Sequence, residues 1–132
     1  MNLNQVTLPV HDMELGCSFY LKLGFTQIVD TPHYARFVCP DGNSTFSLSL
    51  IEGEINNQST IYFESDELDQ LVERLLTRGI EFDDLPEDKS YLWREANLRD
   101  PSGNKIKLYY AGENRLNPPW RVNKRFNVNS DK

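Results

Sequence analysis

Histidine and cysteine are scarce in this chain, which has two of each in 132 residues. Cys17 and Cys39 are too few for a disulfide scaffold and lack the close spacing of a metal-binding pair. Basic residues are also in the minority, since 14 Lys and Arg against 20 Asp and Glu give a net charge of −6. This balance argues against a general affinity for nucleic acid or for anionic membrane surfaces.

Long apolar runs are absent as well. No stretch approaches the roughly 18 residues of a membrane span, and the first residues lack the basic and apolar regions of a secretory signal. We therefore expect a cytoplasmic protein with no membrane partner. With 39% hydrophobic and 26% charged residues, the chain has the composition of a globular protein and enough length for one proper core.

What the chain does contain is one pattern of elements stated twice. A Pro-x-Gly-Asn turn at 40–43 leads into an alternating strand, and the same turn recurs at 101–104. A shift of 55 residues superposes Gly24 on Gly79, and we expect each of these glycines to end a helix. The repetition predicts two strand-helix-strand-strand-strand units in tandem.

The two units are expected at about residues 3–52 and 59–111, inside a single domain that spans residues 1–122. Residues 123–132 are polar, and we expect them to form a flexible tail. Pro118 and Pro119 prevent a helix at that point of the C-terminal extension. The predicted strands lie at 4–10, 25–29, 34–38, 45–51, 60–64, 80–82, 91–98 and 105–110, the predicted helices are capped by Asp12 and by Ser65-Asp66, and the acidic segment 83–88 is predicted as a loop.

Four stretches of this sequence carry a further signal, and they are Val6-Thr-Leu-Pro-Val10, Ser18-Phe-Tyr-Leu-Lys-Leu-Gly-Phe25, Tyr62-Phe-Glu-Ser-Asp-Glu-Leu68 and Asp100-Pro-Ser-Gly-Asn104. These stretches resemble the vicinal oxygen chelate superfamily, which includes glyoxalases, bleomycin-resistance proteins and extradiol dioxygenases. The resemblance covers residues 3–110 and implies an α+β fold. In that fold two βαβββ units form curved mixed sheets around a cavity, with the helices on the outer faces. Proteins of this size in the family commonly pair, so the resemblance also implies a homodimer.

The metal site of metal-dependent family members corresponds here to Gln5, Ser47, Thr60 and Lys107. A protonated lysine offers three donors and no lone pair, and its charge repels a divalent cation. Neutral hydroxyls cannot hold such an ion by themselves. His11 and His33 fall outside the predicted cavity faces, and we expect both at the surface. We therefore predict a cavity with no metal ion and no other cofactor.

Alternation along the strands assigns apolar positions to the helices and their polar neighbours to the cavity. Glu95 is the candidate general base or ligand anchor, and a salt bridge with Lys107 or Arg36 is the alternative for it. Trp93 can stack on a planar ligand or serve only in packing. The full set of predicted ligand-binding residues is Gln5, Thr7, Arg36, Ser47, Thr60, Tyr62, Glu64, Trp93, Glu95, Lys107 and Tyr109.

Three functional hypotheses follow. The first is a homodimer, similar to the bleomycin-resistance branch, that binds a small aromatic or amphipathic organic ligand without metal. The second is a metal-dependent lyase or dioxygenase with a displaced divalent metal site that includes Gln5 and Glu95. The third is a regulatory or interaction module whose cavity is filled by its own aromatic side chains. The sequence leaves open whether any reaction is catalysed.

Overall fold

The computed structural model describes residues 1–126. The predicted flexible tail, residues 123–132, lies partly outside this range. No helix in the described part of the chain is both long enough and apolar enough to cross a membrane. The elements are β1 (Gln5–Val10), α1 (Met13–Leu23), β2 (Thr26–Asp30), β3 (Tyr34–Val38), β4 (Thr45–Leu50), β5 (Thr60–Glu64), α2 (Leu68–Thr77), β6 (Asp84–Asp88), β7 (Arg94–Arg99), β8 (Lys105–Tyr110) and α3 (Glu113–Leu116).

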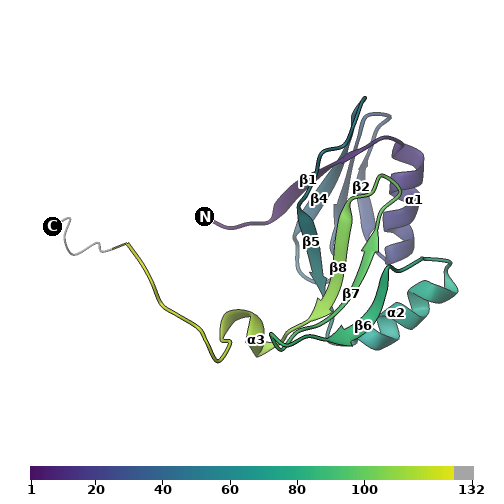
Figure 1. The fold of residues 1–132 in the computed structure, drawn as a ribbon. Helices are drawn as coiled ribbons and strands as arrows, with labels where there is room; N and C mark the ends of the chain where they lie inside the picture. The colour runs from purple at the N-terminus through teal and green to yellow at the C-terminus, as the bar shows by residue number, and fades with distance from the viewer. Residues whose placement is uncertain (127–132) are drawn as a thin grey trace.

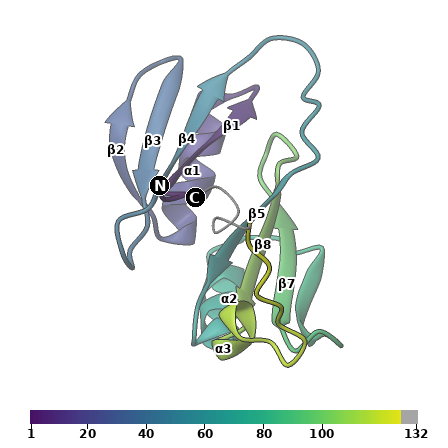
Figure 2. The ribbon, with the colours of Figure 1, turned by 90° about the vertical axis from the view of Figure 1, so that its left-hand side faces the viewer.

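The strands form two four-stranded mixed sheets in the orders β1-β4-β3-β2 and β5-β8-β7-β6. In each sheet the first strand of the unit pairs in parallel with the last, and the other pairs are antiparallel. The two predicted βαβββ units and the α+β class are therefore confirmed. Helices α1 and α2 cover the same side of the molecule, each on its own sheet (Figure 1). The opposite faces stay open, and the two sheets do not close on each other (Figure 2).

The buried core runs through both units as one cluster, as alternation predicts. Leu8, Leu48, Ile106 and Leu108 all point to the helix side and are buried. Phenylalanine rings join the two units, because the Phe63 ring of β5 lies 4.7 Å from the Phe25 ring and 5.5 Å from the Phe46 ring, centroid to centroid. Burial of such rings contributes about 1.5–3 kcal/mol each to the stability of the folded state. Apolar packing therefore holds the two units together in addition to the covalent linker between them.

The first helix begins and ends where the sequence predicts. The Asp12 carboxylate accepts a hydrogen bond from the Leu15 amide at 2.9 Å, and Gly24 ends α1 in the left-handed conformation with φ of 108°. The second helix differs at its start. Its N-cap residue is Glu67, without a side-chain cap bond, while the Ser65 hydroxyl accepts from the Glu67 amide at 3.2 Å.

The prediction was wrong between residues 80 and 93. The acidic segment 84–88 is itself an edge strand, β6, whereas residues 80–82 form no strand and residues 91–93 form a turn ahead of β7. An edge strand tolerates charges and Pro86 because one side of it has no pairing partner, and the register shifts between Asp84 and Glu87. The polar residues and the proline of this segment therefore led to its prediction as a loop, although it is a strand at the edge of the sheet.

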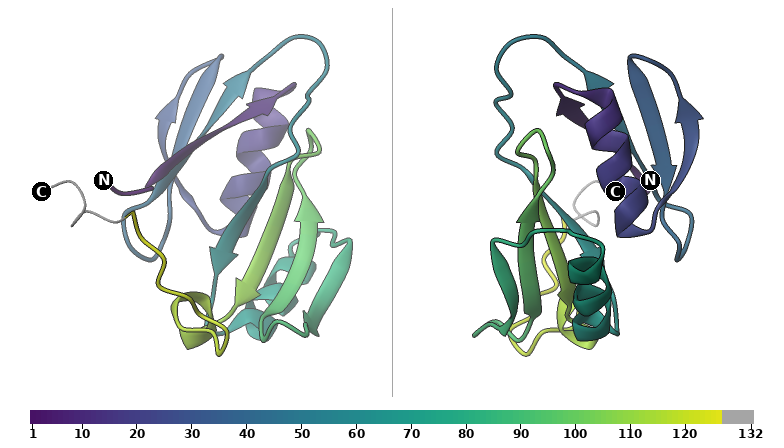
Figure 3. Two further views of the ribbon diagram at one scale, coloured as in Figure 1. Left: turned by 60° about the vertical axis from the view of Figure 1, so that its left-hand side comes forward. Right: turned by 90° about the vertical axis from the view of Figure 1, so that its right-hand side faces the viewer.

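The turn Asp100–Asn104 lies between the units and ties them together (Figure 3). The buried Asp100 carboxylate accepts hydrogen bonds from the Tyr20 hydroxyl of α1 and from the Asn104 amide side chain, both at 2.8 Å. The same Asn104 side chain donates to the Pro9 carbonyl of β1 at 2.8 Å and accepts from the Asn57 side chain at 2.9 Å. The turn at 100–104 of the second unit thus binds β1, α1 and the linker between the units through these hydrogen bonds.

Tyr20→Phe is expected to lower the free energy of unfolding by about 1–3 kcal/mol, because Asp100 then loses a buried donor. Tyr110→Phe, which removes a hydroxyl from an exposed tyrosine, should change it by less than about 0.5 kcal/mol. Urea unfolding followed by circular dichroism gives both values. Equal stability of the two variants would show that the bond from Tyr20 does not hold the units together.

Candidate functional site

An aromatic cluster covers the open face of the second sheet. The Trp93 ring, just ahead of β7, stacks on the Tyr109 ring of β8 with centroids 4.7 Å apart and an interplanar angle of 22°. The Tyr62 ring of β5 stands perpendicular to both, at 6.0 Å from Trp93 and 5.6 Å from Tyr109. The Tyr109 side chain is buried, whereas Tyr62 is exposed and Trp93 is half-buried. One face of the Trp93 ring therefore packs on Tyr109, which is the packing role that the sequence analysis gave as an alternative to ligand stacking.

An ion pair lies beside these rings. The Lys107 ammonium is 3.0 Å from Glu95 Oε1, with side-chain exposures of only 17% and 3%. The ammonium also lies 5.3 Å from the centre of the Tyr62 ring. The salt bridge between Glu95 and Lys107, which the sequence analysis gave as an alternative role for Glu95, is thus present. Arg36 does not contact Glu95 and donates to Tyr34 instead. A pair this buried is costly to separate, because either partner alone is an uncompensated charge.

Tyr91 closes one side of the pair, since its hydroxyl donates to Glu95 Oε1. This hydrogen bond is the main cause that raises the pKa of Tyr91 to about 12. The other carboxylate oxygen, Glu95 Oε2, is buried and has no hydrogen-bond partner among the described residues. Because Oε1 is engaged twice and Oε2 is shielded, the geometry favours Glu95 as a fixed anchor rather than as a free general base.

The C-terminal extension turns this surface into a cavity of about 300 Å³, which we call the aromatic cavity. The Trp93 indole nitrogen donates to the Asn114 carbonyl at 3.4 Å. Glu64 holds the extension in place, because its Oε2 accepts from the Ala111 and Gly112 amides at 2.8 and 3.0 Å. The cavity is lined by Tyr62, Tyr91, Trp93 and Glu95 from the sheet and by Asn114, Arg115, Pro118 and Trp120 from the extension.

The open face of the first sheet carries a different, polar group of side chains. Ser47 is fully buried and sits at the centre, where its hydroxyl accepts from the Gln5 amide at 2.8 Å and shares a hydrogen bond with the Tyr34 hydroxyl at 2.6 Å. The Arg36 guanidinium donates to the Tyr34 oxygen at 2.9 and 3.2 Å. The bonds from Ser47 and then from Arg36 lower the pKa of Tyr34. These residues form one connected polar network.

Eight of the eleven predicted site residues therefore fall into two groups, one on each sheet. Gln5, Ser47 and Arg36 meet in the polar network, while Tyr62, Trp93, Glu95, Lys107 and Tyr109 meet around the aromatic cavity. Thr7 lies on β1 in register with Ser47, and Thr60 begins β5 opposite Lys105. Glu64 is engaged in holding the extension.

The residues that the resemblance places at metal positions do not fit a divalent ion in this geometry. Gln5 binds Ser47 through its amide nitrogen and accepts from Thr45 through its oxygen, and Lys107 offers an ammonium, which has no lone pair for a metal. Across residues 1–126 no group of three or more His, Cys, Asp and Glu side chains is arranged to hold a metal. Gln5 and Glu95 lie on different sheets.

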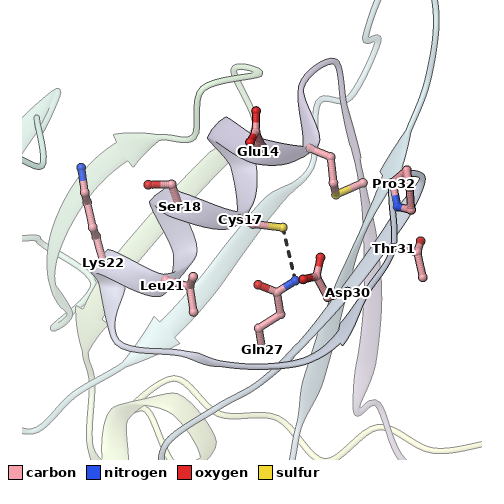
Figure 4. A pocket seen from close by; sticks show the side chains of 10 residues that line it. Glu14, Cys17, Ser18, Leu21, Lys22, Gln27, Asp30, Thr31 and Pro32 are labelled. Carbon is pink, nitrogen blue, oxygen red and sulfur yellow. Dashed lines mark hydrogen bonds between the residues drawn. The ribbon is translucent and has the colours of Figure 1, made fainter.

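A larger depression of about 900 Å³ lies on the helix side, between α1 and β2 (Figure 4). The Cys17 sulfur there accepts a hydrogen bond from the Gln27 amide at 3.6 Å, and burial raises the pKa of the thiol. Met13, Leu21 and Pro32 supply much of its wall. Cys17 is a free thiol buried in the core cluster.

Tyr34, Tyr91, Asn114 and Arg115 were missed by sequence reasoning. Tyr34 could have been found, because it lies two positions before Arg36 on the same strand and therefore on the same face. Tyr91 could not be found from alternation, because it lies in the turn before β7, where Leu92 adopts a positive φ of 69°. Asn114 and Arg115 reach the site from α3, outside both repeated units.

The fold and these two faces define a class of protein with paired βαβββ units. Residues 2–108 match the family model of the Glyoxalase/Bleomycin resistance protein/Dioxygenase superfamily, and the chain belongs to that superfamily. It is 26% identical over 127 residues to the uncharacterized protein YraH of Bacillus subtilis (strain 168), with 83% of this chain and 98% of the relative covered.

Solved structures show the same fold. A glyoxalase/bleomycin resistance protein/dioxygenase from Nocardioides has a TM-score of 0.75 at 24% identity, with 93% of this chain and 90% of that one covered. A bleomycin-binding protein in complex with bleomycin has a TM-score of 0.71 at 18% identity, with 83% and 98% covered.

Glu95→Gln is expected to bring the pKa of Tyr91 from about 12 down toward its ordinary value near 10, because the charged acceptor is removed. The folded state favours the protonated phenol, so the stabilisation from this bond is present below about pH 10 and is lost as the pH rises through 12. Titration of the Tyr91 ring carbons by NMR measures the shift, with Glu87→Gln on β6 as the control. A Tyr91 that titrates alike in wild type and Glu95→Gln would contradict the bond.

Proposed function

We propose that the protein binds a small aromatic or amphipathic organic molecule, without metal, in the aromatic cavity. The observation that carries the proposal is the arrangement of Tyr62 and Trp93 beside the buried Glu95–Lys107 pair. Small-molecule sites are concave and combine aromatic or apolar walls with a few fixed polar groups, and this cavity combines four aromatic rings with the buried Glu95. The aromatic rings supply area for a planar group, and the ion pair supplies orientation.

The size and composition of the cavity favour this reading over an interaction module with a filled cavity. The rings stack on each other and still leave about 300 Å³, near the lower end of known ligand pockets. Tyr62 and Trp120 remain exposed at its edges. The structural likeness to a bleomycin-binding protein is in agreement with an organic ligand, although it extends to the fold alone.

A homodimer forms part of the proposal. The open faces of both sheets carry the polar network and the aromatic cluster, and a second copy seated there would enclose both. We also assign the protein to the cytoplasm, because Cys17 and Cys39 are free thiols. The alternative of a lyase or dioxygenase with a displaced metal site at Gln5 and Glu95 is tested separately below.

Ligand binding is expected to shift the indole N–H signal of Trp93. The chain has two tryptophans, so Trp120→Phe assigns both signals. Useful probes are 2-naphthylmethanol, 2-naphthylmethylamine and 2-naphthoate, which share one ring and differ in charge. Trp93→Ala should weaken binding of the best probe by at least about tenfold through loss of stacking. Tyr110→Ala, which removes an exposed ring from the helix-side positions of β8, should leave it unchanged. Equal loss in both variants, or no binding by any aromatic probe, would contradict the proposal.

No stoichiometric metal is expected to remain after the protein is incubated with nickel, zinc, manganese or iron(II) and desalted. The reason is the donor set, in which Lys107 occupies the place of a carboxylate. Elemental analysis measures the metal content. One equivalent per chain that is abolished by Glu95→Gln and kept in Glu87→Gln would instead establish the displaced metal site and favour a lyase or dioxygenase.

A further inference from the structure

Residues 117–126, which we call the C-terminal arm, are apolar and basic and lie exposed. Trp120, Val122 and Phe126 have exposed fractions of 56%, 68% and 77%. The arm contains three basic residues and no acidic one, whereas residues 1–116 contain 19 acidic and 10 basic residues. Large apolar side chains on a segment with charge opposite to that of the body are typical of a binding segment rather than of a solvated tail.

The arm leaves the molecule on the open side of the sheets. The N-terminus and the arm project from that side, opposite α1 and α2 (Figure 1), and in the view onto the open faces the arm runs toward the viewer (Figure 2). Pro118 and Pro119 fix the backbone φ angle at the start of the arm, where Pro118 and Trp120 still line the aromatic cavity of their own chain. The arm therefore points to the place where a second copy would face these sheets.

A cleft of about 890 Å³ with complementary chemistry lies between the two units. Its apolar wall includes Leu23, Phe25 and Phe63. Acidic side chains outnumber basic ones around it, because Asp41, Glu64, Asp66 and Glu67 stand against Arg74 and Arg115. An acidic rim over an aromatic and aliphatic floor matches a segment in which Arg121, Lys124 and Arg125 alternate with Trp120, Val122 and Phe126.

We propose that the C-terminal arm of one copy docks in the cleft between the two units of a second copy. This inference rests on the proposed homodimer and is independent of the small-molecule ligand. An extended arm spans up to about 30 Å over its ten residues, which exceeds the roughly 10 Å between facing sheets. Trp120 also lines the aromatic cavity of its own chain, so an arm fixed by the partner would fix one wall of that cavity.

Sedimentation equilibrium tests the contribution of the arm to dimerisation. Trp120→Ser/Phe126→Ser should raise the dimer dissociation constant by at least about tenfold, because anchoring aromatic residues dominate interfaces. Leu15→Ser/Leu21→Ser, which alters two exposed residues on α1, is the matched control and should leave it unchanged. An unchanged constant in the arm variant would overturn the inference and leave the dimer standing. A monomeric wild type would overturn both.

Charge reversal tests the cleft. Arg121→Glu/Lys124→Glu/Arg125→Glu should also weaken the dimer at least about tenfold, and the further changes Asp66→Lys/Glu67→Lys in the same chain should restore most of the loss. Failure of the restored variant to dimerise better than the arm variant would place the arm elsewhere.

Cross-linking separates exchange between copies from folding back within one copy. Cys39 lines the cleft. A chain with Lys124→Cys and both natural cysteines changed to serine is mixed with a Cys17→Ser chain, and a short bismaleimide is added. The expected product joins the two different chains. A chain with Lys124→Cys and Cys39 together that forms only an internal link would show that the arm occupies its own cleft and would contradict the proposal.

Discussion

The Asp100 carboxylate is the point on which the arrangement of the two units depends. It lies buried in the second unit, yet one of its donors is the Tyr20 hydroxyl of the first unit, and Asn104 beside it binds Pro9 of β1. A buried carboxylate requires all of these donors, because an unpaired one is costly. The turn therefore sets how β1, α1 and the linker sit relative to the second sheet, and through them which open faces lie side by side.

The second sheet carries a buried ion pair beside the aromatic cluster on its open face. The Lys107 ammonium neutralises Glu95, and the resemblance aligns Lys107 with a metal-ligand position of metal-dependent members. Tyr91 completes the arrangement by donating to the same oxygen. The result is a fixed polar group beside an aromatic wall, which on the proposed function would orient a bound molecule.

Much of the fold could be predicted because local signals agree with each other. Asp12, Gly24 and Gly79 mark helix ends, and strict alternation in β1, β4, β5 and β8 assigns their faces. Prediction failed at β6, where an edge position tolerates a polar sequence with a proline. The site was harder to predict, because alternation along a strand shows which face of the sheet a side chain occupies but not which residue it contacts. It could not show that Arg36 binds Tyr34 rather than Glu95, or that α3 would complete the cavity.

The most direct test of this account is a map of backbone amide shifts during titration of the isotopically labelled, metal-free protein with the naphthyl probe that binds most tightly. We expect the largest changes in β7, β8 and residues 113–120, around Trp93, Tyr62 and the Glu95–Lys107 pair. Changes confined to the depression between α1 and β2, or binding that appears only after a divalent metal is added, would contradict the assignment of the aromatic cavity as a metal-free ligand site.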